Sequence, residues 1–119
     1  METRERIQTT YDPAEWESLE TLLFCLGVNW SYRGFGLALE AALMLKRDNS
    51  LKSCMKIIYI DVAKKNRTGG ENVRRDITTL ARVIWRDGNR ERLEEMAGKR
   101  SDRPPTCREF IGILADLNL

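Results

Sequence analysis

Apolar residues recur every three or four positions along most of this chain, which is the spacing of one face of an α-helix. The first such segment covers residues 13–26, with Asp12 as a favourable N-cap, Pro13 at the first helical position and Gly27 as its end. A second segment covers residues 37–47. Their inward-facing residues are Trp16, Leu19, Leu22, Leu23 and Leu26 in the first segment, and Leu37, Ala41, Met44 and Leu45 in the second.

Two further helices are expected before a turn at Thr68-Gly69-Gly70. Ser50 is placed to cap the first of them, and Asp61 is placed to cap the second, which is short. The buried residues of these two helices would be Leu51, Cys54, Met55 and Ile58 in the first, and Val62 and Ala63 in the second.

The longest amphipathic segment covers residues 71–85. Its apolar residues share one face that is roughly 100° wide, at about 100° of rotation per residue. They are Val73, Ile77, Leu80, Ala81 and Ile84. The opposite face is polar and carries Glu71, Asn72, Arg75, Thr78, Thr79 and Arg82, with Arg74 and Asp76 on its two flanks.

The rest of the chain continues the helical pattern. Asp87-Gly88-Asn89 is a break, residues 90–97 form a short amphipathic helix, and Thr106 is placed to cap a last helix. That helix would pack inward through Phe110, Ile111, Leu114 and Leu117. No β-type alternation of any length occurs, so the sequence predicts an all-α, compact bundle of about six helices. A flexible polar leader is expected over residues 1–12, and one domain over residues 13–119.

The short helix at Asp61, the turn and the long helix together have the layout of a helix-turn-helix unit. In DNA-binding proteins the second helix of this unit enters the major groove, where arginine pairs well with O6 and N7 of guanine. Arg75 lies at the centre of the polar face and is the leading candidate for base reading, with Asn72, Arg74 and Glu71 beside it. The candidates for phosphate contacts are Lys64, Lys65, Arg67, Thr68, Thr78, Thr79 and Arg82. A polar face of this kind also fits a helix that merely solvates the surface, and the pattern alone leaves both interpretations open.

Charge is distributed unevenly along the chain. The net charge is +2, but residues 64–108 hold 13 Lys and Arg against 7 Asp and Glu, a local +6. The remaining residues hold 7 against 11, a local −4. This asymmetry favours one surface that faces a polyanion such as double-stranded DNA.

Composition argues against several other classes of protein. The chain has no histidine, so the commonest general base and metal ligand is absent, and neither an enzyme, a metal site nor a cofactor is expected. Cys25, Cys54 and Cys107 each sit beside apolar neighbours and are interpreted as reduced core thiols. The aromatic residues are scattered rather than set as a stacking platform for RNA. No segment is long and apolar enough to span a membrane, and a cytoplasmic protein is expected.

Several short runs carry a resemblance to a known family. They are Leu26-Gly27-Val28, Gly34-Phe35, Leu39-Glu40-Ala41, the run YIDVAKK at residues 59–65, Val73, Arg75, Ile77, Val83 and Trp85 of the long helix, Gly88-Asn89, Pro105-Thr106 and Glu109-Phe110-Ile111. In register from about Leu19 to Leu117, they resemble the C-terminal DNA-binding effector domain of the sporulation initiation response regulator (stage 0 sporulation protein A family).

The resemblance implies a six-helix domain that binds a short DNA box and contacts RNA polymerase, often with tandem copies side by side as a homodimer on DNA. Arg75 matches the guanine-reading arginine of the family. Other positions depart from the family pattern: Arg74 stands for a base-reading glutamate, Asn72 for an arginine, Thr78 and Thr79 for an Arg-His pair that contacts the DNA backbone, and Asp76 for a small residue. The same docking with a different preferred sequence is expected. Asp76 would repel phosphate if it faced DNA, or would pair with a neighbouring arginine.

Three points stay open from the sequence. The receiver domain of the family has no counterpart here, so the chain is either a fragment of a longer protein or a stand-alone effector. The last helix is a candidate dimer surface, and the loop at residues 98–105 is a candidate contact for polymerase or for phosphate. The second functional hypothesis is a protein-interaction module that keeps the fold and has lost specific DNA binding.

Overall fold

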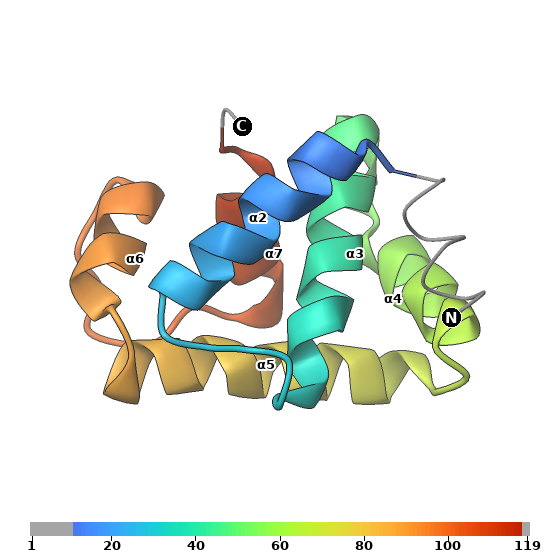
Figure 1. Cartoon of the computed structure of the whole chain (residues 1–119). Coiled ribbons are helices and arrows are strands. Elements are labelled where there is room, and N and C mark those ends of the chain that lie inside the picture. The colour runs from blue at the N-terminus through green and yellow to red at the C-terminus, as the bar shows by residue number, and fades with distance from the viewer. Residues whose placement is uncertain (1–10, 118–119) are drawn as a thin grey trace.

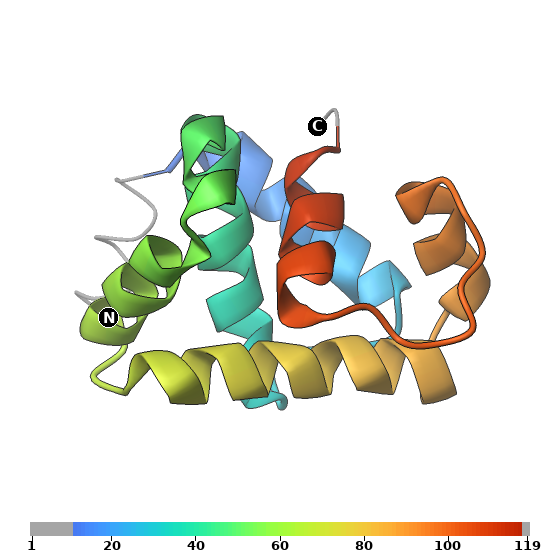
Figure 2. The same cartoon turned by 180° about the vertical axis from the view of Figure 1, so that it is seen from behind.

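The computed structural model describes residues 11–117, and within them it contains six α-helices, one 3₁₀ helix and no strand. The α-helices are α2 (Pro13–Cys25), α3 (Arg33–Arg47), α4 (Met55–Lys65), α5 (Gly70–Asp87), α6 (Arg90–Ala97) and α7 (Cys107–Ala115), and the 3₁₀ helix is η1 (Asn49–Ser53). The predicted all-α bundle is therefore confirmed. Helix α5 crosses one end of the molecule, and the other helices rise from one side of it (Figures 1 and 2).

Helix α3 is the centre of the core. It packs against α2, α4, α5 and α7, and ten of its residues are buried. Two glycines near its start allow close approach. A Cβ on Gly34 would lie 2.2 Å from the backbone oxygen of Asp76 on α5, and one on Gly36 would lie 2.7 Å from the ring of Trp30. This explains why α3 begins at Arg33 and not at residue 37 as the sequence suggested: the glycines serve packing within the helix rather than a loop.

The segment before the turn differs from its prediction. Asp48, not Ser50, caps the 3₁₀ helix by accepting a hydrogen bond from the Ser50 backbone at 3.1 Å. One α-helix then covers Met55–Lys65, so Asp61 lies inside it and does not cap a separate short helix. The break falls at Cys54, whose backbone angles (φ −144°, ψ 69°) are not helical and separate the two elements.

The predicted starts of the first and last helices are confirmed by their caps. Asp12 Oδ1 accepts a hydrogen bond from the Ala14 backbone at 2.9 Å, with Pro13 at the first position of α2. Thr106 and Glu109 form a reciprocal capping box at the start of α7. The side chain of each residue accepts a hydrogen bond from the backbone N–H of the other. Most of the predicted leader lies outside the described residues, as do residues 118 and 119. Tyr11, at the end of that leader, is buried.

The cysteines and aromatics differ from their predictions as well. Cys107 is a buried free thiol, but Cys25 and Cys54 are exposed, because both lie at the ends of their elements rather than on an inward face. Three of the aromatic residues interpreted as scattered lie together: Tyr11, Trp16, Trp30, Phe35 and Phe24 follow one another in a row of ring contacts, with centroids 4.7 to 6.5 Å apart. Trp85 is not part of this row and packs under Arg90 instead. This row fastens α2 and the loop after it to α3.

Candidate nucleic-acid interface

Helices α4 and α5 are consecutive, pack against each other and are joined by the turn at residues 66–69. Hydrogen bonds to residues of α3 and α4 hold this turn in place. Asn66 Nδ2 donates to the Val62 carbonyl at 2.8 Å and to Glu40 Oε2 at 3.1 Å. Arg67 adopts a left-handed backbone (φ 53°), and the Thr68 backbone N–H donates to the Ala63 carbonyl at 3.0 Å. The arrangement is consistent with a helix-turn-helix unit, although its first helix begins seven residues earlier than the sequence suggested, at Met55 instead of just after Asp61.

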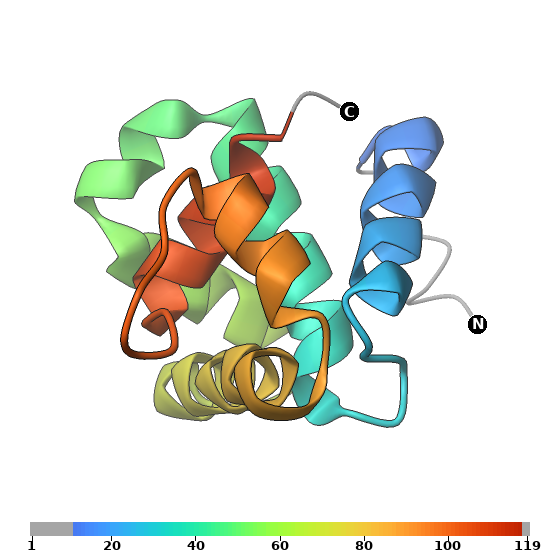
Figure 3. The same ribbon diagram turned by 90° about the vertical axis from the view of Figure 1, so that its left-hand side faces the viewer.

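Helix α5 is buried on one side only. All five predicted apolar residues, Val73, Ile77, Leu80, Ala81 and Ile84, are at most 1% exposed. Seen nearly end-on in Figure 3, α5 lies at the edge of the molecule, with the loop before α7 on one side and the start of α3 on the other. Arg75 and Arg82, which lie on the polar face, are both exposed.

A chain of hydrogen bonds leads from the turn to Arg75. Asn72 Nδ2 donates to Thr68 Oγ1 at 3.2 Å, and Arg75 Nη2 donates to Asn72 Oδ1 at 2.6 Å. A guanidinium group has five N–H donors, so this single bond leaves enough of them for a bidentate contact with a base. Asn72 therefore holds the side chain of Arg75 in place while most N–H donors of that side chain stay available.

Glu71 and Arg74 pair with each other one turn apart on the same helix. Arg74 Nε donates to Glu71 Oε1 and Oε2 at 3.1 and 3.2 Å, and its Nη2 donates to Oε1 as well. These bonds lower the pKa of Glu71 below its ordinary value. Both side chains are exposed, and the pair engages only the Nε and Nη2 groups of Arg74, which leaves its other N–H donors outside the pair.

The two threonines use their hydroxyl protons within the helix. Thr78 Oγ1 donates to the Arg74 carbonyl at 2.7 Å, and Thr79 Oγ1 donates to the Arg75 carbonyl at 3.0 Å. In this rotamer each hydroxyl presents only acceptor lone pairs outward, whereas a phosphate oxygen needs a donor. As placed, the two side chains are poor phosphate ligands.

The basic residues on the approach to α5 are in different environments. Lys65 Nζ pairs with Asp61 Oδ2 at 3.2 Å and lies 5.4 Å from the centre of the Tyr11 ring. Lys64 and Arg67 are exposed and make no side-chain hydrogen bond or ion pair within residues 11–117. The structure thus leaves Lys64 and Arg67 available and holds Lys65 against its own subunit.

Arg86 is a residue that the sequence analysis missed. The helix was expected to end at Trp85, but it continues to Asp87. At about 100° per residue, Arg86 lies only ~20° around the helix from Arg75, eleven positions earlier. Arg82 and Arg86 are exposed, and neither makes a side-chain hydrogen bond or ion pair within the described part of the chain. The continuation of the polar spacing past Trp85 was the signal that could have revealed it.

Asp76 neither lies at the centre of the exposed face of α5 nor pairs with a neighbouring arginine, the two arrangements that the sequence suggested. The residue is partly buried, its backbone lies against Gly34 of α3, and its side chain makes no ion pair within residues 11–117. The expected pairing with a neighbouring arginine is therefore wrong. Because Arg75 and Arg82 occupy the centre of the exposed face, Asp76 is displaced from it by roughly 100° around the helix.

A family model described as "Sporulation initiation factor Spo0A C terminal" matches residues 19–117, most of the chain. The chain belongs to this family. The Spo0A C-terminal family consists of DNA-binding effector domains, so the chain is, in general terms, a DNA-binding regulatory domain. The match covers the same stretch over which the residues resemble the family. Asn72, Arg74, Thr78 and Thr79, at which the sequence departs from the resemblance, all lie outside the buried face of α5.

Two of the suggested partner surfaces can be compared with the structure. Helix α7 buries Cys107, Phe110, Ile111, Gly112, Leu114 and Ala115 in the core, so any dimer contact through it would use the opposite face of the helix. The loop before α7 lies beside α5 (Figure 2). No helix within the described residues is long and apolar enough to cross a bilayer.

Proposed function

We propose that this domain binds duplex DNA sequence-specifically as a transcriptional regulator, with the exposed face of α5 in the major groove. The observation that carries the proposal is the state of Arg75. Its guanidinium is exposed, about one turn into the helix, and its hydrogen bond goes to Asn72 on the same face rather than to another element. An arginine held in this way is ready to meet O6 and N7 of guanine with little loss of side-chain freedom.

The roles within the interface follow from the contacts. Arg75 reads a base, Asn72 positions Arg75, and Glu71 with Arg74 form a pair that exchanges partners on binding. Lys64, Arg67, Arg82 and Arg86 are exposed cations suited to phosphates on either side of the groove. Lys65, Thr78 and Thr79 contribute less, because their polar groups already have partners in the protein. RNA polymerase and a second copy of the chain on neighbouring DNA remain proposed partners, and the cytoplasm remains the proposed location.

The test begins with selection of a preferred duplex from a randomised pool by the unaltered protein. Arg75→Ala should then weaken binding to that duplex by about 1–3 kcal/mol and relax selection at one base position. Binding of the same variant to a scrambled duplex should change little. Arg92→Ala is the matched control, because Arg92 is an exposed arginine on α6 whose partner is Glu95. Equal affinity of the unaltered protein for all duplexes would remove sequence reading from the proposal.

The second candidate is a protein-interaction module with the same fold. It is favoured by the two threonine hydroxyls, which donate to the helix backbone at positions where the family has an Arg-His pair. The Glu71–Arg74 pair points the same way, because it offsets charge on the face that would meet DNA. This alternative predicts no salt-dependent binding to duplex DNA.

A further inference from the structure

A hollow of about 430 Å³ lies between α5 and the loop that precedes α7. Its lining includes three arginines, two threonines and no carboxylate. The residues concerned are Arg74, Thr78 and Arg82 from α5, and Arg103 and Thr106 from the loop. Arg103 is separated from Arg82 by about twenty residues of chain, and only the fold brings these two residues to the lining of one hollow.

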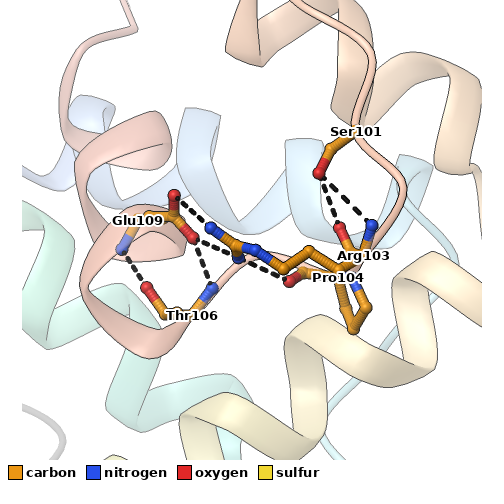
Figure 4. Close-up of polar contacts among 5 residues, drawn as sticks. All are labelled: Ser101, Arg103, Pro104, Thr106 and Glu109. Carbon is orange, nitrogen blue, oxygen red and sulfur yellow. Dashed lines mark hydrogen bonds and ion pairs between the residues drawn. The ribbon is translucent and has the colours of Figure 1, made fainter.

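Arg103, one of the residues that line this hollow, is held by hydrogen bonds at both its backbone and its guanidinium group (Figure 4). Its Nη1 and Nη2 donate to Glu109 Oε1 and Oε2 at 2.8 and 3.2 Å, and Nη1 also donates to the Pro104 carbonyl at 3.2 Å. Ser101 Oγ fixes the backbone of the same residue by accepting from its N–H at 3.3 Å and donating to its carbonyl at 2.9 Å. A side chain tied down at both ends loses little further entropy when it binds a ligand.

The charges around the hollow favour a single anion. Glu71 and Glu109 pair with Arg74 and Arg103, so the five groups together carry +1, and Arg82 supplies the cation that no carboxylate offsets. Neither Glu71 nor Glu109 is among the residues that line the hollow, whereas Arg74, Arg82 and Arg103 all are. The capping box already supplies hydrogen-bond acceptors to the backbone N–H groups at the start of α7, so the attraction for an anion comes from the arginines.

We propose that this hollow binds one backbone phosphate of the DNA whose major groove receives α5. The inference rests on the proposed function. A helix lying in a major groove has sugar-phosphate backbones on both sides, and the groove is about 12 Å wide. The loop before α7 flanks α5 (Figures 2 and 3) and so lies where one of those backbones would pass. Arg82 and Arg103 then form a clamp on this phosphate that sets the register of the helix.

The experiment compares Arg82→Gln and Arg103→Gln with Arg100→Gln, a matched charge removal in the same loop that does not line the hollow. Binding to the selected duplex and to a scrambled duplex is measured by fluorescence anisotropy over a range of salt concentrations. The two hollow variants should each lose about three- to tenfold in affinity for both duplexes and about 0.9 in salt slope. Arg100→Gln should change neither quantity.

A second arm locates the phosphate itself. Duplexes carrying one neutral methylphosphonate at each backbone position in turn are titrated with the unaltered protein and with both hollow variants. At one backbone position the methylphosphonate should lower the affinity of the unaltered protein for the duplex. At that same position it should cause no further loss of affinity in Arg82→Gln or Arg103→Gln. Thermal melting shows whether a loss of affinity reflects a loss of stability. Arg103→Gln breaks the ion pair with Glu109, so its melting temperature has to be measured beside its affinity. Arg82 has no ion-pair partner within residues 11–117, so Arg82→Gln should melt at the same temperature as the unaltered protein.

The outcomes distinguish the two proposals. If the hollow variants bind like the unaltered protein while Arg75→Ala loses selectivity, the clamp is overturned and the proposed function stands. If the unaltered protein shows no salt-dependent binding to any duplex, both are overturned.

Discussion

At the scale of single residues, Glu40 connects the core to the turn of the interface. Its side chain is only 2% exposed, and its Oε2 accepts a hydrogen bond from Asn66 in the turn at 3.1 Å. Burial raises the pKa of Glu40 to about 7, against the opposing effects of the Asn66 bond and of the charge on Lys65, while Asp61 adds to the increase. In the folded protein the Glu40 carboxyl group therefore gains and loses its proton near neutral pH.

This gives a prediction for stability against pH. The folded state holds the proton up to about pH 7, whereas the unfolded chain releases it near pH 4.5, so protonation stabilises the fold below pH 4.5 and this contribution is lost as pH rises to 7. The free energy of unfolding should fall by about 2–3 kcal/mol between pH 5 and pH 8. Glu40→Gln should remove most of this decrease. Urea denaturation at both pH values measures it, and parallel pH profiles of the two proteins would contradict it.

At the scale of elements, the crossing of α3 and α5 depends on one missing side chain. Gly34 faces the backbone of Asp76 so closely that a Cβ would lie 2.2 Å from the oxygen and 2.8 Å from the carbonyl carbon. Backbone atoms in a helix cannot yield as the end of a flexible side chain can. The contact therefore fixes how deeply the proposed recognition helix sits on the core.

Gly34→Ala should destabilise the protein by about 1–3 kcal/mol, because the two helices must move apart to admit a methyl group. Gly112→Ala is the matched control: it lies in helix α7, and a Cβ there would meet nothing within 4 Å. Helix propensity alone should make that variant more stable by about 0.5–1 kcal/mol. Urea denaturation of both variants measures the difference in sign, and changes of the same sign would refute the close-contact explanation.

Element boundaries show how far local patterns carry. The buried face of α5, the cap at Thr106 and the break at Gly88 were predictable, because they depend on residues within a few positions of each other. The start of α3 and the continuity of α4 were not. Gly34 was interpreted as part of a loop and Asp61 as a cap, whereas both lie inside helices, and Gly34 packs there against the backbone of Asp76, which is distant in the sequence.

At the scale of the whole molecule, the longest dimension is 38 Å, close to one turn of B-DNA at about 34–36 Å. The segment at residues 64–108, which carries the local charge of +6, contains α5, the loop before α7 and the hollow between them.

The whole-molecule prediction is a steep dependence of duplex affinity on salt. If about three to five of the exposed arginines and lysines release counterions from phosphates, a plot of log affinity against log salt should have a slope of roughly −3 to −5. Titrations of a scrambled duplex between low and physiological salt measure this slope. A slope near zero would exclude backbone contacts and support the protein-interaction module instead.

The sequence by itself determined the helical class, the inward face of α5, the caps at both ends of the fold and membership in the family, because each depends on periodicity or on short runs of neighbouring residues. The tertiary structure decided which polar groups are available. It turned Lys65 toward Asp61 and Tyr11, left Arg86 exposed, and placed Arg103 beside Arg82. Helix formation is governed by bonds between residues four apart, whereas the partner of a side chain depends on which distant segment the core brings to it.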